Sequence, residues 1–297
     1  MVREKTNKIL ITVLICCVIF IIAFIFIIFG LKNNKISNNS GENKNNEAVA
    51  SKRPFGVWWW DSDLDIENYL NFAQENGINE IYYCDSLLDE NVSNFITEAN
   101  KRGIDVFLLA GEKEWLLDRT KLENLIEKYT AFQSQNENIQ FKGLHLDIEP
   151  HQFDDFDEKR QDYIFKLIEL ADYLKTTYAN ISFDYDIPFW FDDEIEYKNE
   201  TKSAYKHMID IADRVFVMSY RDTAEKIYEV GKDEVQYAQN LEKRLFLCVE
   251  TKSSEGDKVS FMEEGKEYMN QELMKLKELI PSNFGISIHQ IKTWFDL

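Results

Sequence analysis

The sequence is poor in the residues that build disulfide frameworks, metal centres and phosphate-binding loops. Of its four cysteines, two lie in one N-terminal apolar run, and Cys84 and Cys248 lie far apart in two others. No disulfide framework or Cys/His metal site has suitable spacing, so we expect Cys84 and Cys248 to be buried free thiols. No glycine-rich phosphate loop and no Gly-x-Ser-x-Gly elbow occurs. We therefore predict a protein that uses neither a metal nor another cofactor.

Basic residues are also scarce, with 34 Lys and Arg against 53 Asp and Glu. Eight of the basic and three of the acidic residues lie in residues 1–53. The remaining 26 basic and 50 acidic residues give residues 54–297 a net charge of −24. A surface this acidic repels phosphate backbones, so we expect no nucleic-acid partner.

Charge is absent altogether from Ile9 to Gly30. A helix of about 20 apolar residues spans a bilayer, whereas the apolar core of a cleaved signal peptide has only about 7–15 residues. We predict a transmembrane signal-anchor at residues 9–30 after a cytoplasmic tail at residues 1–8. Residues 31–53 are rich in Asn, Lys and Ser and are expected to form a flexible tether. The protein would then be a single-pass protein of the cell membrane with an extracellular domain.

Short apolar segments alternate with longer amphipathic ones through residues 54–297. The amphipathic segments, such as LDIENYLNFAQENG and DENVSNFITEANKRG, place apolar residues three and four apart, as helices do. Gly77 and Gly103 follow these two segments, where glycine commonly ends a helix. The apolar segments predict eight strands, at Phe55–Trp60, Glu80–Cys84, Ile104–Ala110, Phe141–Ile148, Ile181–Ile187, Arg214–Tyr220, Arg244–Val249 and Gly285–His289.

Eight strand–helix repeats in this length predict an α/β fold, a (β/α)8 TIM barrel over residues 54–297. A doubly wound open sheet usually has a glycine-rich turn after its first strand, but the segment WWWDSDLD contains no glycine. Only Ile291–Leu297 follow the last strand, so we expect the eighth helix to be very short or absent.

The predicted strand ends are acidic and aromatic. Active sites of TIM barrels lie at the C-terminal ends of the strands. Aromatic faces stack on sugar rings and carboxylates bind hydroxyls or exchange protons, so these ends favour an oligo- or polysaccharide substrate. Asp184 and Asp186 share one face of strand five and could bind hydroxyls or set the pKa of neighbouring acids. The predicted substrate-binding residues are Trp60, Asp61, Asp85, Glu112, His145, Asp184, Asp186, Trp190, Arg221 and His289.

Strand four carries the sharpest signal. Side chains alternate along a strand, so His145, Asp147 and Glu149 share one face, and three leucine and isoleucine side chains share the other. The apolar face suits contact with helices, which leaves three polar groups for the barrel interior and mouth. Pro150 ends the strand directly after Glu149. A structural hydrogen-bond network is the alternative, but three such groups on one strand favour a functional site.

The segment FKGLHLDIE (Phe141–Glu149) resembles the strand-four signature of family 18 glycoside hydrolases, the chitinases and endo-N-acetylglucosaminidases. In that signature an apolar residue and Asp-Gly precede an apolar residue and Asp-x-Asp-x-Glu. Gly143, Asp147 and Glu149 match it, whereas Lys142 and His145 stand where the family has acids.

Two further segments are similar to this family. Met218-Ser219-Tyr220 resembles the Met-x-Tyr that ends the family's sixth strand, although Arg221 follows here in place of a frequent Asp. The family also has a Trp near strand eight that forms the floor of the sugar site, for which Trp294 is the candidate. The resemblance implies a TIM-barrel glycosidase.

The resemblance also implies substrate-assisted hydrolysis, a recognised exception to the two-carboxylate scheme. Glu149 would protonate the glycosidic oxygen, and the substrate's 2-acetamido carbonyl would attack the anomeric carbon. Asp147 would orient the acetamido group, and Tyr220 would hydrogen-bond its oxygen. Independently of the family, a carboxylate at Asp147 raises the proton affinity of Glu149, as a general acid requires.

The sequence also allows other interpretations of Glu250 and of the barrel's function. Glu250 ends strand seven, where many retaining barrel glycosidases place a nucleophilic Glu, so Glu149 and Glu250 could form a two-glutamate pair. Glu250 could equally be ion-paired with Lys252 or another cation at the rim. The barrel could also be a non-catalytic carbohydrate-binding module, or its acidic surface could bind a partner protein.

Overall fold

The computed structural model describes residues 52–61, 63–253 and 256–297. Residues Lys52–Leu297 form one compact unit, which begins two residues before the predicted start of the domain. Arg53, which we expected in the tether, belongs to this unit because its guanidinium donates to the carbonyl oxygens of Lys277, Pro281 and Phe284. The predicted tail, anchor (9–30) and most of the tether lie outside the described residues. Within those residues, no helix is both long enough and apolar enough to cross a membrane.

Eight parallel strands form the centre of the unit. They are β1 (Phe55–Trp59), β2 (Glu80–Cys84), β3 (Asp105–Ala110), β4 (Leu144–Leu146), β5 (Phe183–Pro188), β8 (Arg214–Met218), β9 (Arg244–Glu250) and β10 (Gly285–His289). They close into a barrel in the order β1-β10-β9-β8-β5-β4-β3-β2. The predicted (β/α)8 barrel is therefore confirmed.

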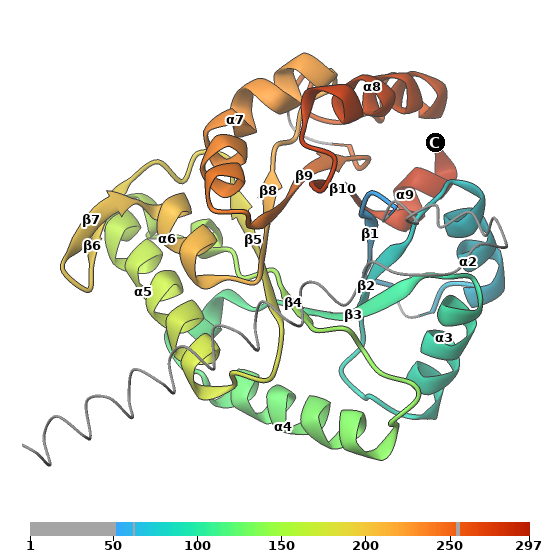
Figure 1. The fold of residues 1–297 in the computed structure, drawn as a ribbon, viewed down its shortest axis with the longest axis horizontal. Helices are drawn as coiled ribbons and strands as arrows, with labels where there is room; N and C mark the ends of the chain where they lie inside the picture. The colour runs from blue at the N-terminus through green and yellow to red at the C-terminus, as the bar shows by residue number, and fades with distance from the viewer. Residues whose placement is uncertain (1–51, 62, 254–255) are drawn as a thin grey trace, which may run out of the picture. The chain divides into compact units, whose positions relative to one another are not determined.

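Helices follow the strands and surround the barrel (Figure 1). They are α2 (Ile66–Glu75), α3 (Glu90–Lys101), α4 (Thr120–Gln135), α5 (Phe156–Thr177), α6 (Ala204–Ile211), α7 (Ala224–Asn240), α8 (Lys266–Leu279) and α9 (Ile291–Asp296). Two short 3-10 helices, η1 (Lys113–Leu116) and η2 (Pro150–Gln152), follow β3 and β4. The last helix has only six residues, as expected from the short segment after strand eight. Gly77 and Gly103 have φ values of 79° and 71°, which confirms the predicted helix ends.

The two largest differences from the predicted strands are the length of β4 and an additional hairpin. β4 has only three residues, because Pro150 has no N–H and the segment beyond Leu146 turns away into η2. An antiparallel hairpin of β6 (Glu194–Tyr197) and β7 (Glu200–Ser203) was not predicted. Its two turn residues, Lys198 and Asn199, both have positive φ, but neither is the glycine that usually marks such a turn.

Side-chain alternation divides the core into two layers. Outward-facing apolar residues, including Leu144, Leu146 and Ile148, pack against the helices. Inward-facing residues form a separate cluster inside the barrel: Trp58, Tyr82, Phe107, Leu109, Phe216, Phe246 and Cys248. The predicted faces of strand four are thus confirmed. Cys84 and Cys248 are both free; Cys248 is buried as expected, and Cys84 is partly buried.

Candidate active site

Asp147 and Glu149 directly follow β4 at its C-terminal end. The amide of Asp147 donates to the carbonyl oxygen of Ala110 over 3.0 Å, which ties the segment to the end of β3. Gly111 is the first residue after β3 and packs against the backbone of Asp147. A Cβ at Gly111 would lie 1.8 Å from the carbonyl oxygen of Asp147. The backbone under Asp147 is therefore fixed by a contact that only glycine allows.

The acids at the end of β4 hold protons strongly. Burial raises the pKa of Asp147 well above its ordinary value, and the charges of Asp186 and Glu149 raise it further. Burial and Asp186 also raise the pKa of Glu149, although Gln152 and His289 oppose this. Oδ1 of Asp147 is buried and has no hydrogen-bond partner among the described residues. Such an environment suits a general acid at Glu149.

The segment after Glu149 supplies neighbours that we did not predict. Gln152 donates from Nε2 to Oε2 of Glu149, and Nε2 of His151 lies 3.5 Å from Oε1. The ring of His151 also meets the edge of Trp190, with centroids 5.5 Å apart. The guanidinium of Arg160 lies over the ring of Trp190, 4.5 Å from its centroid. His151 and Gln152 could have been found in the sequence as two polar residues that directly follow Pro150.

Tyr220 follows β8 and is partly exposed. Burial raises the pKa of its phenol well above the ordinary value, and the charges of Glu250 and Asp147 contribute, so the hydroxyl remains a donor. Its ring lies 6.3 Å from that of His289, at an interplanar angle of 29°. Arg221 donates to the carbonyl oxygen of Tyr220 and lies over the ring of Phe189, so its guanidinium is held at the rim.

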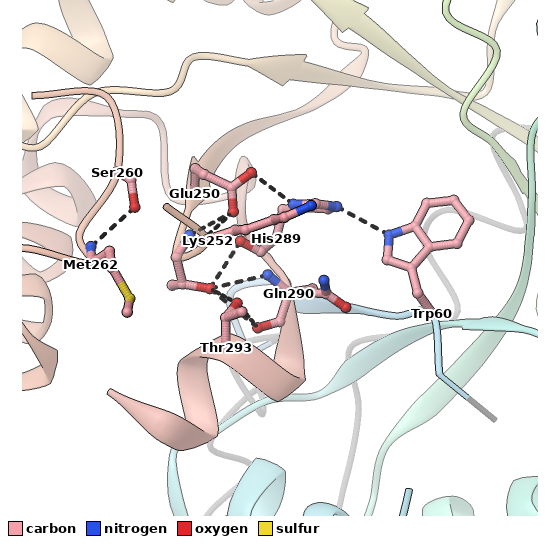
Figure 2. A network of polar contacts seen from close by, with 9 residues as sticks. Trp60, Glu250, Lys252, Ser260, Met262, His289, Gln290 and Thr293 are labelled. Atoms are coloured by element: carbon pink, nitrogen blue, oxygen red, sulfur yellow. Dashed lines mark hydrogen bonds and ion pairs between the residues drawn. The ribbon is translucent and has the colours of Figure 1, made fainter. Parts of the chain in front are cut away.

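His289 links the ends of β1, β9 and β10, as Figure 2 shows. Its Nδ1 lies 2.8 Å from Oε2 of Glu250, and its Nε2 accepts from the indole N–H of Trp60 over 3.1 Å. These partners require a proton on Nδ1 and a lone pair on Nε2, which assigns the neutral tautomer. Trp60 and His289 thus form a fixed wall of the mouth.

Glu250 has both carboxylate oxygens occupied. Oε1 accepts from the backbone N–H groups of Thr251 and Lys252, at 2.8 and 2.7 Å, and Oε2 is taken by His289. The contact with Lys252 is made by its backbone N–H. A nucleophilic carboxylate needs an oxygen free to attack, so these contacts weigh against the two-glutamate pair.

The barrel interior below Asp147 holds three residues that we predicted to bind substrate. His145 and Asp184 have no exposed surface and Asp186 is 3% exposed, so none can contact a sugar in this structure, and that prediction is wrong. Asp186 instead bonds His145 over 2.8 Å, and its charge acts on Asp147 and Glu149. For Asp186, the geometry agrees with the alternative prediction, in which the strand-five acids set the pKa of the strand-four acids.

Trp60, Asp85 and Glu112 line one pocket of about 370 Å³ beside the mouth. Asp85 also accepts from the amides of Leu87 and Leu88, which fixes its loop. Glu112 forms a 3.0 Å ion pair with Lys121 of α4. Trp115 and Lys128 also line the pocket, which combines aromatic residues with charged groups of both signs. Sequence reasoning placed three of these residues at strand ends but did not find Trp115, which lies in η1.

Asp61 and Trp294 contribute least to the mouth. Asp61 forms a 3.0 Å ion pair with Lys292 at the rim. Trp294 is 1% exposed and packs against the rings of Phe55 and Phe72, outside the barrel. The prediction that Trp294 forms the floor of a sugar site is therefore wrong, because α9 turns this side chain into the helix layer.

Comparison with known proteins shows the fold. No family profile and no curated sequence matches the chain. Its structure is similar to that of a GH18 chitinase from Pseudoalteromonas aurantia, with a TM-score of 0.54, 11% identity, and 81% of this chain and 95% of the other covered. A chitinase from Bacteroides thetaiotaomicron gives a TM-score of 0.53 at 12% identity, covering 82% and 91% of the two chains. One from Rhizomucor miehei gives 0.50 at 13% identity, covering 82% and 95%. The resemblance to family 18 is thus confirmed at the level of the fold.

Proposed function

We propose that the barrel is a glycoside hydrolase that acts on glycans containing N-acetylhexosamine by substrate-assisted, retaining hydrolysis. The observation that carries this proposal is the set of acids at the end of β4. Glu149 is partly exposed, and its pKa is raised by burial and by Asp186. Next to it, Asp147 has a buried oxygen that no group of the described residues hydrogen-bonds. The shared fold with the chitinases supports the choice of substrate class.

In the first step, the carbonyl oxygen of the substrate's 2-acetamido group attacks the anomeric carbon. The bond to the leaving sugar breaks as Glu149 gives its proton to the glycosidic oxygen. Asp147 orients the acetamido N–H, and the phenol of Tyr220 donates to the acetamido oxygen. In the second step, Glu149 takes a proton from water, which attacks the anomeric carbon and restores the acetamido group. Configuration is retained because the carbon is attacked twice.

The pocket and the aromatic wall supply binding surfaces for further sugars. Trp60 lies at their junction, since it lines the pocket and bonds His289. Trp190, which contacts His151 next to Glu149, offers a partly exposed indole held by Arg160. We propose that a glycan chain lies across the mouth between these two tryptophans, with Asp85, Glu112 and Arg221 contacting its hydroxyls.

We also propose that the enzyme is tethered to the cell membrane by residues 9–30, with the barrel outside the cell. The support is the uncharged run from Ile9 to Gly30 and the polar segment that follows it. Protease added to intact cells should degrade the barrel and leave the anchor in the membrane fraction. Protection of the barrel in intact cells would contradict this orientation.

The function is tested by incubating the full-length protein in detergent with a panel of oligosaccharides that carry or lack 2-acetamido groups. Cleavage is expected only where the acetamido group is present. Asp147→Asn should slow this cleavage, because a neutral amide oxygen accepts from the acetamido N–H more weakly than a carboxylate does. Cleavage of sugars without acetamido groups would favour the two-glutamate scheme, and binding without cleavage would favour a carbohydrate-binding module.

A further inference from the structure

His145 lies on β4 directly beneath the candidate catalytic acids and is completely buried. Its ring stacks on Tyr82 of β2, with centroids 4.2 Å apart and an interplanar angle of 27°. The edges of Trp58 from β1 and Phe216 from β8 close the other sides, at 5.4 and 4.4 Å. Aromatic rings therefore separate His145 from solvent and from any substrate in the mouth.

Both ring nitrogens of His145 face carboxyl groups of β5. Nε2 lies 2.8 Å from Oδ2 of Asp186, and Nδ1 lies 3.7 Å from Oδ2 of Asp184. A neutral imidazole has one N–H and could serve only one of two carboxylates, whereas an imidazolium has one for each. Burial lowers the pKa of His145, but the charges of Asp186 and Asp184 and the hydrogen bond to Asp186 together raise it above its ordinary value.

Asp184 is itself held as a carboxylate by Arg214 of β8. The guanidinium bonds both of its oxygens, through Nε at 2.9 Å and Nη2 at 2.5 Å. Burial raises the pKa of Asp184, but Arg214 and His145 outweigh it and lower the pKa overall. Arg214 also bonds Glu80 of β2 over 2.6 Å, and Glu80 accepts from the hydroxyl of Tyr82.

These contacts place charges of alternating sign across the barrel interior. The order is Glu80, Arg214, Asp184, His145 and Asp186, with each group next to one or two of opposite sign. Asp186 is the end of the row that acts on Asp147 and Glu149. Other titratable groups near Asp186 are Asp184 on its own strand and His289 of β10.

We infer that His145 is a positioning residue: as an imidazolium fixed by Asp184, it holds Asp186 as the carboxylate that faces Asp147 and Glu149. His145 stands where the family 18 signature has an acid, so this chain places a cation beneath its catalytic acids. The link to catalysis rests on the proposed hydrolase, whereas the charge state of His145 does not. Loss of the imidazolium would let Asp186 take up a proton, since burial raises its pKa and His145 opposes that rise.

The charge state can be measured without any substrate. The chain has four histidines, so ring-¹⁵N-labelled full-length protein in detergent gives few signals, and His→Gln variants assign them. At about pH 7.5, one unit above the ordinary histidine pKa, we expect both ring nitrogens of His145 to be protonated. His151, whose pKa burial and Arg160 lower, should be neutral at the same pH. A neutral His145 at that pH would overturn the inference, even if the protein is an active glycosidase.

The effect on catalysis is tested with His145→Gln, which has an amide donor but no charge. We expect kcat to fall about 10-fold or more, a part of what a general acid contributes, with little change in KM because His145 does not reach the substrate. The alkaline limb of the pH–rate profile should move to lower pH, because a protonated Asp186 no longer raises the pKa of Glu149. His207→Gln is the matched control, since His207 is a buried histidine on α6 that bonds the carbonyl oxygen of Ile195 outside the barrel.

Folding of each variant is checked by thermal unfolding. A folded His145→Gln protein with the wild-type kcat and pH profile would contradict the role of His145. If that variant does not fold, the ¹⁵N measurement on the wild-type protein still decides its charge. An inactive wild-type protein with a protonated His145 would refute the proposed hydrolase and leave the charge assignment standing.

Discussion

The ends of β4 and β9 both present a glutamate at the mouth of the barrel, yet their surroundings differ. Glu149 is partly exposed and receives one side-chain hydrogen bond, from Gln152. Glu250 is 8% exposed and receives three, from two backbone amides and His289. The first carboxyl group lies among other acids that raise its pKa, and the second is surrounded by donors.

The difference lies in how each strand continues. After β4, Pro150 stops the ladder and leaves Glu149 at the start of η2, where no backbone N–H of the described residues donates to its carboxylate. After β9, the chain turns so that the amides of Thr251 and Lys252 point at Glu250. A glutamate at the C-terminal end of a strand is therefore suited to proton transfer after β4, and to holding a loop at the end of β9.

The largest effect is expected for Glu149→Gln. The amide is nearly the same size but carries no acidic proton, so kcat should fall about 10²–10⁴-fold. The temperature of unfolding should change little, because Glu149 makes few stabilising contacts. Steady-state kinetics on an acetamido oligosaccharide measure this. A variant that keeps more than about a tenth of the wild-type kcat would remove Glu149 from its role as general acid.

Glu250→Gln should have the opposite profile. Its NH2 group donates and cannot accept, so at least one of the three donors loses its partner and the free energy of unfolding should fall by about 1–3 kcal/mol. The kcat of the folded enzyme should fall less than about tenfold, far below the loss at Glu149. Chemical denaturation and kinetics on the same sample separate the two effects. If kcat collapsed while stability remained, Glu250 would be the nucleophile after all.

Gly111→Ala would disturb the end of β4 without changing any acid. The new Cβ would lie 1.8 Å from the carbonyl oxygen of Asp147, so the backbone beneath the catalytic acids must move. A misplacement of about 1 Å can lower a rate by about 100-fold, and we expect a fall in kcat of that order. Gly77→Ala is the control, because its Cβ meets nothing within 4 Å. It should cost stability through its φ of 79° and leave kcat unchanged.

Asp186→Asn tests the cause of the raised pKa at Glu149. The negative charge of Asp186 stabilises the protonated form of Glu149. Removing that charge lowers the pKa of Glu149, so the acid loses its proton at a lower pH. The alkaline limb of kcat/KM should therefore move toward acid pH, which rate measurements across the pH range would show. A limb that stays in place or moves to higher pH would assign the raised pKa to burial alone.

The smallest effect on kcat is expected at the β9 end, for Thr251→Val. The hydroxyl of buried Thr251 bonds Gln290 and Thr293 and holds the turn after β10. Its loss should lower the free energy of unfolding by about 1–3 kcal/mol and leave kcat nearly unchanged. Thr130→Val, at an exposed position on α4, should change stability by no more than about 0.5 kcal/mol. A large loss of kcat in Thr251→Val would show that the β9 end takes part in catalysis.

Much of the barrel could be predicted because its signals are local. Alternating apolar segments marked all eight strands, and the faces of strand four followed from its pleat, so Leu144, Leu146 and Ile148 were placed correctly. The hairpin β6–β7 was missed because its segment is polar and its turn has no glycine. Trp294 was misplaced because sequence gives its distance from strand eight but not the direction of the short helix that carries it.

The candidate site could be predicted only in part. Asp147, Glu149 and Tyr220 were chosen from motifs on single strands. Arg214 gave no such signal, since it begins β8 and meets Glu80, 134 residues earlier in the chain, only inside the closed barrel. His145 was expected to contact the substrate because the strand pattern predicts that it faces the barrel interior. The pattern does not predict how deep in the barrel it lies.

The sequence by itself determined the order of strands and helices, the inward face of β4 and the acid pair Asp147 and Glu149. These follow from periodicity and spacing, which act over a few residues. Only the tertiary structure decided which acids are free and which are occupied, because that depends on donors from other strands. Glu250 meets His289 of β10, and Asp186 meets His145 of β4. Hydrogen bonds and burial set the pKa of each carboxyl group, and both arise only when the barrel closes.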